Sequence, residues 1–149
     1  MKRQWRAVLI FIIFPSLMMG CLMNYKLKPT RITLFIESGP HINNDVLLPL
    51  DIIAVDASFS DLILDIGPEA WFGHSARGRL VKNELRRFAI SSGETRKIEV
   101  NVNKKIKRII IYADYEKVID RRGQQVIIEP KRWRFNYTVR IGFNEMELL

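Results

Sequence analysis

Cysteine and histidine are scarce in this chain of 149 residues, which has one cysteine and two histidines. One cysteine cannot form an intrachain disulfide, so a hydrophobic core must hold the fold, and 48% of the residues are apolar. A zinc site usually needs three or four ligands, and His41 and His74 stand in no metal-binding spacing. Glycine-rich phosphate loops and the Gly-x-Ser-x-Gly nucleophile motif are also absent. We therefore expect no metal and no other cofactor.

Two carboxylate pairs remain as candidates for acid–base chemistry, Asp51 with Asp56 and Asp61 with Asp65. The second pair is spaced by one helical turn. Acidic residues are common near helix starts because they interact favourably with the helix dipole. Neither pair therefore indicates an active site, and we predict that the protein is not an enzyme.

The lone cysteine, Cys21, directly follows a segment with the layout of an export signal. Three basic residues open the chain, eight uninterrupted apolar residues follow at 7–14, and Gly20 precedes the cysteine. This arrangement resembles the bacterial lipobox, in which the cysteine receives a diacylglycerol and becomes the mature N-terminus. Met18 stands where that motif usually has leucine. A covalent lipid on Cys21 is the expected consequence.

The resulting division is a lipoprotein signal peptide at 1–20 and a tether at 21–29. No aspartate follows the cysteine, and this favours the outer membrane, with the protein anchored on its periplasmic face. Two alternatives remain open. Residues 7–23 have the minimum length for an uncleaved membrane helix, and a cleaved soluble form is the other possibility.

The chain is basic, with a formal net charge of +8. A basic surface can bind nucleic acid, anionic lipid or an acidic protein, and export across a membrane argues against nucleic acid. The chain has two basic runs, one of Lys104, Lys105, Lys107 and Arg108 and one of Arg121 and Arg122. Each run is expected to be a solvated turn, or else to contact an acidic partner or lipid headgroups.

Residues 30–149 predict a single domain that is mainly β. Apolar and polar residues alternate with a period of two in most segments, as they do in half-buried strands. Several strands have one apolar face, so we predict two sheets packed as an antiparallel β-sandwich. The seven predicted strands are 30–37, 49–55, 85–90, 96–102, 108–115, 125–129 and 134–143.

The pattern changes at 57–83, where a short helical insertion is predicted. Apolar residues recur there at helical spacing, and either Asp56 or Ser58 is expected to cap the first helix. The Gly67-Pro68 step ends one helix and begins another. Trp71-Phe72 is predicted to belong to the core, with a binding patch as the alternative.

Six segments of the chain occur in an order that is typical of one family. They are Cys21, Ile42-Asn43-Asn44-Asp45 before Pro49-Leu50-Asp51-Ile52, the insertion ending at Trp71-Phe72, Ser92-Gly93-Glu94, Ile109 to Tyr115, and Lys131-Arg132-Trp133-Arg134. Together they resemble the TssJ lipoproteins of type VI secretion systems, although Ser92 stands where that family usually has proline.

The resemblance implies a transthyretin-like β-sandwich with added helices and a non-enzymatic role. In that family the lipid holds the domain at the outer membrane, and the domain docks on the periplasmic part of the inner-membrane protein TssM. The loop between the first two strands contributes to docking, and we prefer Ile42 and Asn43 as its contacts. The partner-binding residues implied here are Gly39, Pro40, His41, Ile42, Asn43, Asn44 and Asp45.

A function of another class remains open. The chain could be a ligand-binding lipoprotein, or a pilot- or chaperone-like periplasmic lipoprotein of a different envelope pathway. That alternative predicts an apolar groove in the sandwich or an exposed strand edge that captures a peptide.

Overall fold

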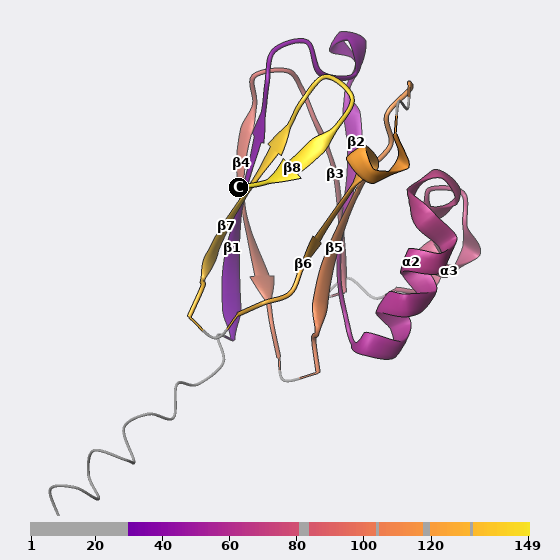
Figure 1. Cartoon of the computed structure of the whole chain (residues 1–149), viewed down its shortest axis with the longest axis vertical. Coiled ribbons are helices and arrows are strands. Elements are labelled where there is room, and N and C mark those ends of the chain that lie inside the picture. Colours follow the sequence, from indigo (N-terminus) through magenta and orange to yellow (C-terminus); the bar gives the residue numbers. More distant parts are fainter. Residues whose placement is uncertain (1–29, 81–83, 104, 118–119, 132) are drawn as a thin grey trace, which may run out of the picture.

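Two four-stranded sheets packed face to face form the body of the computed structural model (Figure 1). The structure describes residues 30–80, 84–103, 105–117, 120–131 and 133–149. One sheet has the order β4-β1-β7-β8 and consists of β4 (Thr95–Asn101), β1 (Arg31–Ser38), β7 (Asn136–Ile141) and β8 (Met146–Leu148). The other has the order β3-β2-β5-β6 and consists of β3 (Leu85–Ile90), β2 (Leu48–Val55), β5 (Arg108–Ala113) and β6 (Gln125–Ile128). The predicted β-sandwich is confirmed.

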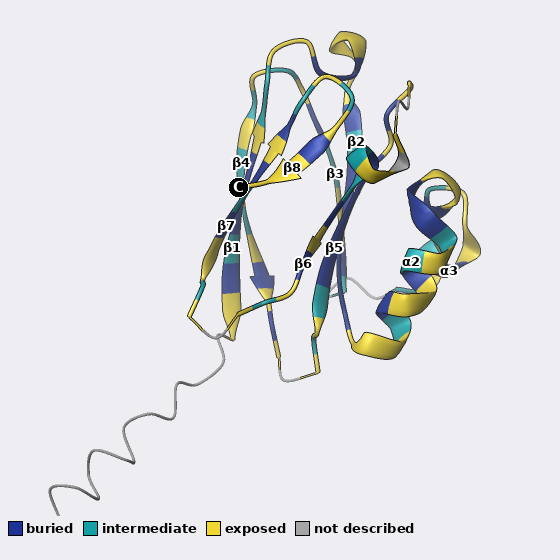
Figure 2. Cartoon of the chain, viewed as in Figure 1, coloured by how far each residue is buried: buried dark blue, intermediate teal, exposed yellow. Residues whose placement is uncertain are grey.

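The main core lies between the inner faces of the two sheets (Figure 2). Successive side chains of a strand point to opposite faces, and β1 accordingly buries Ile32, Leu34 and Ile36 at alternate positions. The central strands β2 and β5 are instead buried at nearly every position. Their continuous apolar sequences fit this double burial, because two helices cover the outer face of their sheet.

These helices are α2 (Ala57–Trp71) and α3 (Ser75–Arg79). Asp56 caps α2, since its carboxylate accepts a hydrogen bond of 2.9 Å from the backbone N–H of Phe59. Gly67 has a φ of 73° and kinks the helix immediately before Pro68. The predicted helical insertion is thus confirmed as far as residue 80. A second apolar cluster lies between helices and sheet, and it includes Ile53, Val55, Ile63, Trp71, Ile110 and Tyr112.

The pairing of the strands differs from the prediction in two respects. β1 and β7 are parallel, with Thr33 opposite Asn136, while the other pairs among the described strands are antiparallel. β8 is an eighth strand, at the edge of its sheet, and its three residues are too few to show a period. Two short 3₁₀ helices, η1 (Ile42–Asp45) and η2 (Arg121–Gln124), complete the elements.

The sandwich has two ends, which the strand directions define (Figure 1). The chain enters β1 at Arg31, and we call this the entry end; the loop at 39–47 lies at the opposite, distal end. The predicted signal peptide at 1–20, the tether at 21–29 and the lipid-bearing Cys21 all lie outside the described residues. No helix in the described part of the chain has the length and apolar character needed to cross a membrane.

Candidate functional site

The loop predicted to bind a partner connects β1 to β2 at the distal end. Four of its residues have left-handed backbone torsions, with φ values of 56° at His41, 47° at Asn43, 55° at Asn44 and 64° at Asp45. Asparagine and aspartate adopt this region more readily than most residues. The Asn-Asn-Asp sequence therefore permits a tightly coiled loop instead of an open connection.

Neighbouring segments hold this loop through hydrogen bonds. The backbone N–H of Gly39 donates to the carbonyl of Ile141, and that of Asn43 donates to the carbonyl of Phe143, both at 2.9 Å. The N–H of Glu116 donates to the Asn43 side-chain oxygen at 2.8 Å. The loop consequently shares one surface with the β7–β8 turn and with the segment after β5.

The two preferred contact residues point into the protein. Ile42 is 0% exposed and belongs to the main core, and Asn43 is 3% exposed with its amide oxygen engaged by Glu116. Neither side chain faces the surface of the domain, and direct contact of these two residues with a partner stays a prediction. Their role is to position the loop: one anchors it in the core and the other ties it to the chain after β5.

Other side chains form the exposed surface of this end. Pro40, His41, Asn44 and Asp45 are exposed, as predicted for a loop. The sequence reasoning missed Val46 and Leu47, which are 46% and 60% exposed, and Phe143 in the adjacent turn. Apolar residues surrounded by polar ones are typical of protein interfaces. We call the following set the distal surface: Pro40, His41, Asn44, Asp45, Val46, Leu47 and Phe143.

An ion pair crosses the tip of the loop. The Nδ1 atom of His41 lies 2.9 Å from Oδ2 of Asp45, and the hydroxyl of Ser92 donates to Oδ1 of Asp45 at 3.0 Å. The hydrogen bond with Asp45 raises the pKa of His41 above its ordinary value. The same bond, with the one from Ser92, lowers the pKa of Asp45. Both residues are therefore charged between these two pKa values.

A buried polar cluster joins the helical insertion to β2. Asp51 is 1% exposed, and its Oδ2 accepts a hydrogen bond of 2.8 Å from Nε1 of Trp71. Arg77 donates to both carboxylate oxygens, at 2.6 Å and 3.0 Å. These hydrogen bonds of the Asp51 side chain thus hold the helical insertion against β2, and Trp71 belongs to the core as predicted. This carboxylate has a structural role.

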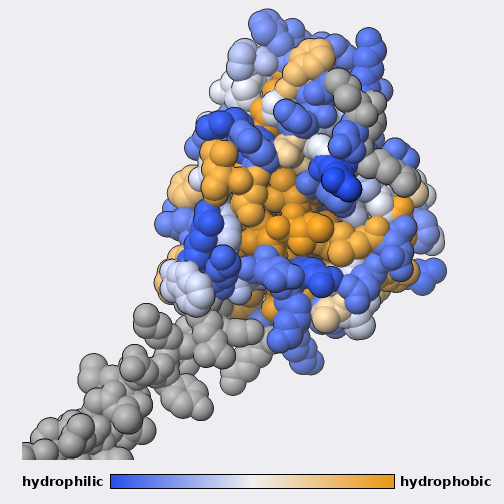
Figure 3. Space-filling view, viewed as in Figure 1, coloured by the Kyte–Doolittle hydropathy of each residue, from blue (hydrophilic) through white to orange (hydrophobic). Residues whose placement is uncertain are grey.

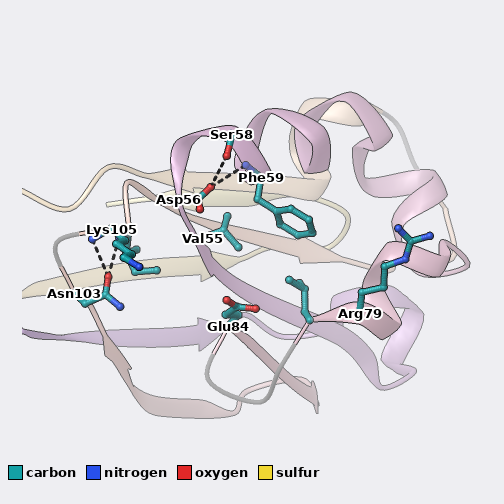
Figure 4. Close-up of a pocket in the computed structure, with 10 residues that line it drawn as sticks. Val55, Asp56, Ser58, Phe59, Arg79, Glu84, Asn103 and Lys105 are labelled. Atoms are coloured by element: carbon teal, nitrogen blue, oxygen red, sulfur yellow. Dashed lines mark hydrogen bonds between the residues drawn. The ribbon is translucent and has the colours of Figure 1, made fainter.

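A cavity of about 360 Å³ lies at the entry end, between the start of α2 and the turn before β5 (Figure 4). Phe59 points into it, with Val55 beside Phe59. The polar groups on its rim serve local structure: Asp56 caps α2, and the side-chain oxygen of Asn103 accepts from the N–H of Lys105 at 2.8 Å. The hydroxyl of Ser58 also lines the cavity and donates to Oδ1 of Asp56 at 3.0 Å, within the cap of α2.

Neither histidine is placed to bind a metal. His74 lies at a helix end as predicted, and its Nδ1 accepts a hydrogen bond of 3.1 Å from the N–H of Ala76 at the start of α3. Among the residues that the structure describes, no group of three or more histidine, cysteine, aspartate or glutamate side chains is arranged to hold a metal ion.

Apolar side chains also gather at the centre of the face shown in Figure 3, over β6 and toward α2. β6 is an edge strand, and its Ile127 is 39% exposed. An exposed edge is what the alternative function predicts. However, β6 has only four residues, and very short edge strands are one means by which sandwiches avoid pairing with other chains.

No protein-family model and no curated protein sequence matches the chain. Solved structures do. A chain of a structure described as "Type VI membrane complex" superimposes with a TM-score of 0.68 at 13% identity, over 82% of this chain and 99% of that one. The T6SS lipoprotein TssJ1 from Pseudomonas aeruginosa gives 0.62 at 18% identity, over 81% and 95%. A structure described as the T6SS protein TssM C-terminal domain from EAEC gives 0.64 at 13% identity, over 80% and 97%. The chain shares the fold of the chains matched in these structures.

Proposed function

We propose that the chain is a TssJ-type lipoprotein of a type VI secretion system. A lipid on Cys21 anchors it at the periplasmic face of the outer membrane, and its distal surface docks the periplasmic part of TssM. The lipoprotein and membrane-complex descriptions of the structures that share its fold support this proposal. One such structure is described as the C-terminal domain of TssM, and this description supports TssM as the partner.

The arrangement of the two ends is the observation that carries the proposal. The described chain begins at the entry end, where β1 starts, and the loop at 39–47 lies beyond the far end of β1. β1 has eight residues, and at a rise of about 3.3 Å per residue it spans about 26 Å. A lipid at Cys21 would therefore hold the entry end at the bilayer and present the distal surface to a protein on the other side of the periplasm.

The composition of the distal surface suits docking. Leu47, Val46 and Phe143 provide exposed apolar area on a loop that hydrogen bonds hold in place. A preformed surface loses little conformational entropy on binding, and a few apolar residues near the centre of an interface usually dominate its affinity. We expect Leu47 to be the main contact because it is the most exposed of the three.

Docking is tested by capture of the purified periplasmic part of TssM. Leu47→Asp should weaken capture roughly tenfold or more, since a charge would enter the apolar centre of the contact, while the thermal midpoint stays near that of the wild type. Leu62→Asp is the matched control, because Leu62 is 44% exposed and lies on α2, away from the distal end. Equal capture by wild type, Leu47→Asp and control would remove this loop from the interface.

The anchor is tested separately. Wild-type protein should fractionate with the outer membrane, and Cys21→Ser should not. Mass spectrometry of the mature N-terminus should show acylated Cys21 as the first residue. An unmodified thiol, with residues 1–20 still attached, contradicts the lipoprotein assignment and supports the uncleaved membrane helix.

A further inference from the structure

An exposed aromatic pair lies at the entry end, outside the proposed docking surface. Trp133 is 70% exposed and Phe135 is 52% exposed, both in the segment that leads from β6 into β7. The N–H of Thr33, near the start of β1, donates to the carbonyl of Phe135 at 2.7 Å. The pair therefore lies beside the point where the chain enters the domain. Most of the Trp133 surface is therefore open to a contact outside the domain.

Basic side chains accompany these aromatic residues. Lys131 precedes Trp133, and Lys105 and Lys107 lie at the same end in the turn before β5; all three are exposed. The N–H of Lys107 donates to the carbonyl of Val55 at 3.0 Å, which places that turn at the entry end of β2.

Several acidic side chains of this end pair with arginines, while Asp56, which caps α2 at the same end, interacts electrostatically with Lys105. Glu99 pairs with Arg31 at 2.9 Å, and Arg108 pairs with Asp61 at 2.6 Å and Glu129 at 3.5 Å. Neither Lys107 nor Lys131 forms an ion pair with a residue in the described part of the chain. These ammonium groups are consequently available to an anionic surface.

We infer that Trp133, Phe135, Lys105, Lys107 and Lys131 form a membrane-contact patch that rests on anionic phospholipid headgroups. This inference rests on the proposed anchor, and adds a second, non-covalent contact that orients the domain on the bilayer. Tryptophan is enriched at membrane–water interfaces because its amphipathic ring fits the headgroup layer. Lysines near an anionic leaflet add electrostatic attraction.

A phospholipid surface is the occupant that the placement favours. The nine residues from Cys21 to Pro29 can extend at most about 3.3–3.6 Å each, so a lipid on Cys21 keeps the entry end within about 30 Å of the bilayer. Tethering of this kind raises the effective concentration of the membrane for any surface at that end. A weak patch is therefore sufficient to fix which face meets the lipid, and with it the direction of the distal surface.

The patch is tested on the full chain reconstituted in vesicles of phosphatidylethanolamine and phosphatidylglycerol. Matched vesicles contain phosphatidylcholine in place of phosphatidylglycerol, and both carry brominated acyl chains as quenchers. The chain has three tryptophans, so the emission of Trp133 is taken as the difference between wild type and Trp133→Phe. We expect this emission to be blue-shifted and quenched in the anionic vesicles, and less so in the neutral ones or at high salt.

The lysines are tested by charge reversal. Each lysine near an anionic surface contributes about fivefold in binding, so Lys131→Glu should release the patch and restore most of the Trp133 emission. Lys117→Glu is the matched control, because Lys117 is exposed in the segment after β5, at the distal end. Equal effects of the two substitutions would overturn the inference.

Flotation of the same vesicles separates this inference from the proposed anchor. Wild-type chain that floats while Trp133 stays unquenched and water-like overturns the patch and leaves the anchor intact; the surface would then be free for a protein partner. Chain that fails to float with either vesicle overturns both. Flotation with quenching in the anionic vesicles supports both.

Discussion

The buried carboxylate of Asp51 provides the sharpest test of how the helical insertion is attached. Replacing it with alanine removes the acceptor for Nε1 of Trp71 and for two nitrogens of Arg77. Trp71 is 0% exposed, so water cannot replace the lost acceptor without opening the second core cluster. We therefore expect Asp51→Ala to loosen α2 and α3 from the sheet and to destabilise the whole domain.

The magnitude follows from the burial of the partners. Removing one member of a buried ion pair typically costs about 3–5 kcal/mol, and a stranded buried N–H accounts for about 1–3 kcal/mol of that. The side chain of Arg77 is 27% exposed and regains part of its hydration, which favours the lower end of the range. With an m-value of about 1.5 kcal/mol/M for urea, the unfolding midpoint should fall by about 2 M.

The assay is urea unfolding, followed by far-UV circular dichroism and by tryptophan fluorescence, to which the buried Trp71 contributes. Asp61→Ala is the matched control, because Asp61 also pairs with an arginine but its side chain is 68% exposed; such surface pairs contribute little. Asp51→Asn should lie between wild type and Asp51→Ala, since it keeps an acceptor and loses the charge. Equal midpoints for Asp51→Ala and Asp61→Ala would refute the reasoning.

Three further predictions concern the loop and the helix kink. Ile42→Ala should destabilise the domain by about 2–4 kcal/mol through a core cavity, measured by urea unfolding; an unchanged midpoint would mean that Ile42 is not buried. The His41 pKa measured by NMR should exceed 6.5 and return toward it in Asp45→Asn. Because folding raises the pKa of His41, the stability that His41 contributes to the loop is complete below pH 6.5 and is lost as the pH rises through the raised pKa. The pKa of Asp45 is lowered, so the stability that Asp45 contributes is lost as the pH falls through that lowered pKa. A normal pKa for His41 would contradict the ion pair. Gly67→Ala should lower the thermal midpoint, because Gly67 has a φ of 73° and a ψ of 167°, a region essentially restricted to glycine that costs other residues about 1–3 kcal/mol. An equal midpoint would contradict this.

Much of the fold is predictable from local sequence pattern. The alternation in Ile32, Leu34 and Ile36 determines which face of β1 is buried, and the Gly67-Pro68 step marks the kink in α2. The parallel pairing of β1 with β7 could not be predicted in this way. Their residues are about a hundred positions apart in the chain, and alternation is the same for a parallel and an antiparallel neighbour.

The loop between β1 and β2 could also be predicted only in part. Its position and turn-forming residues are visible in the sequence, but the direction of each side chain depends on the left-handed torsions at His41 and Asn43, which flank Ile42 and allow it to face the core. A lone isoleucine among polar loop residues is a signal for such an anchor. Val46 and Leu47 could have been noticed as two apolar residues at the end of a loop that is otherwise rich in turn formers.

The central position of β1 connects the two proposed contacts. Its entry end follows the predicted tether, and its other end leads into the distal loop. β1 pairs with β4 along 31–37 and with β7 along 33–38, so it is hydrogen-bonded on both sides over almost its whole length. A pull between bilayer and partner would run along this strand and would have to shear both ladders together, instead of unzipping an edge. Pairing on both sides of β1 would thus give the domain the mechanical continuity that the proposed link between a membrane and a partner requires.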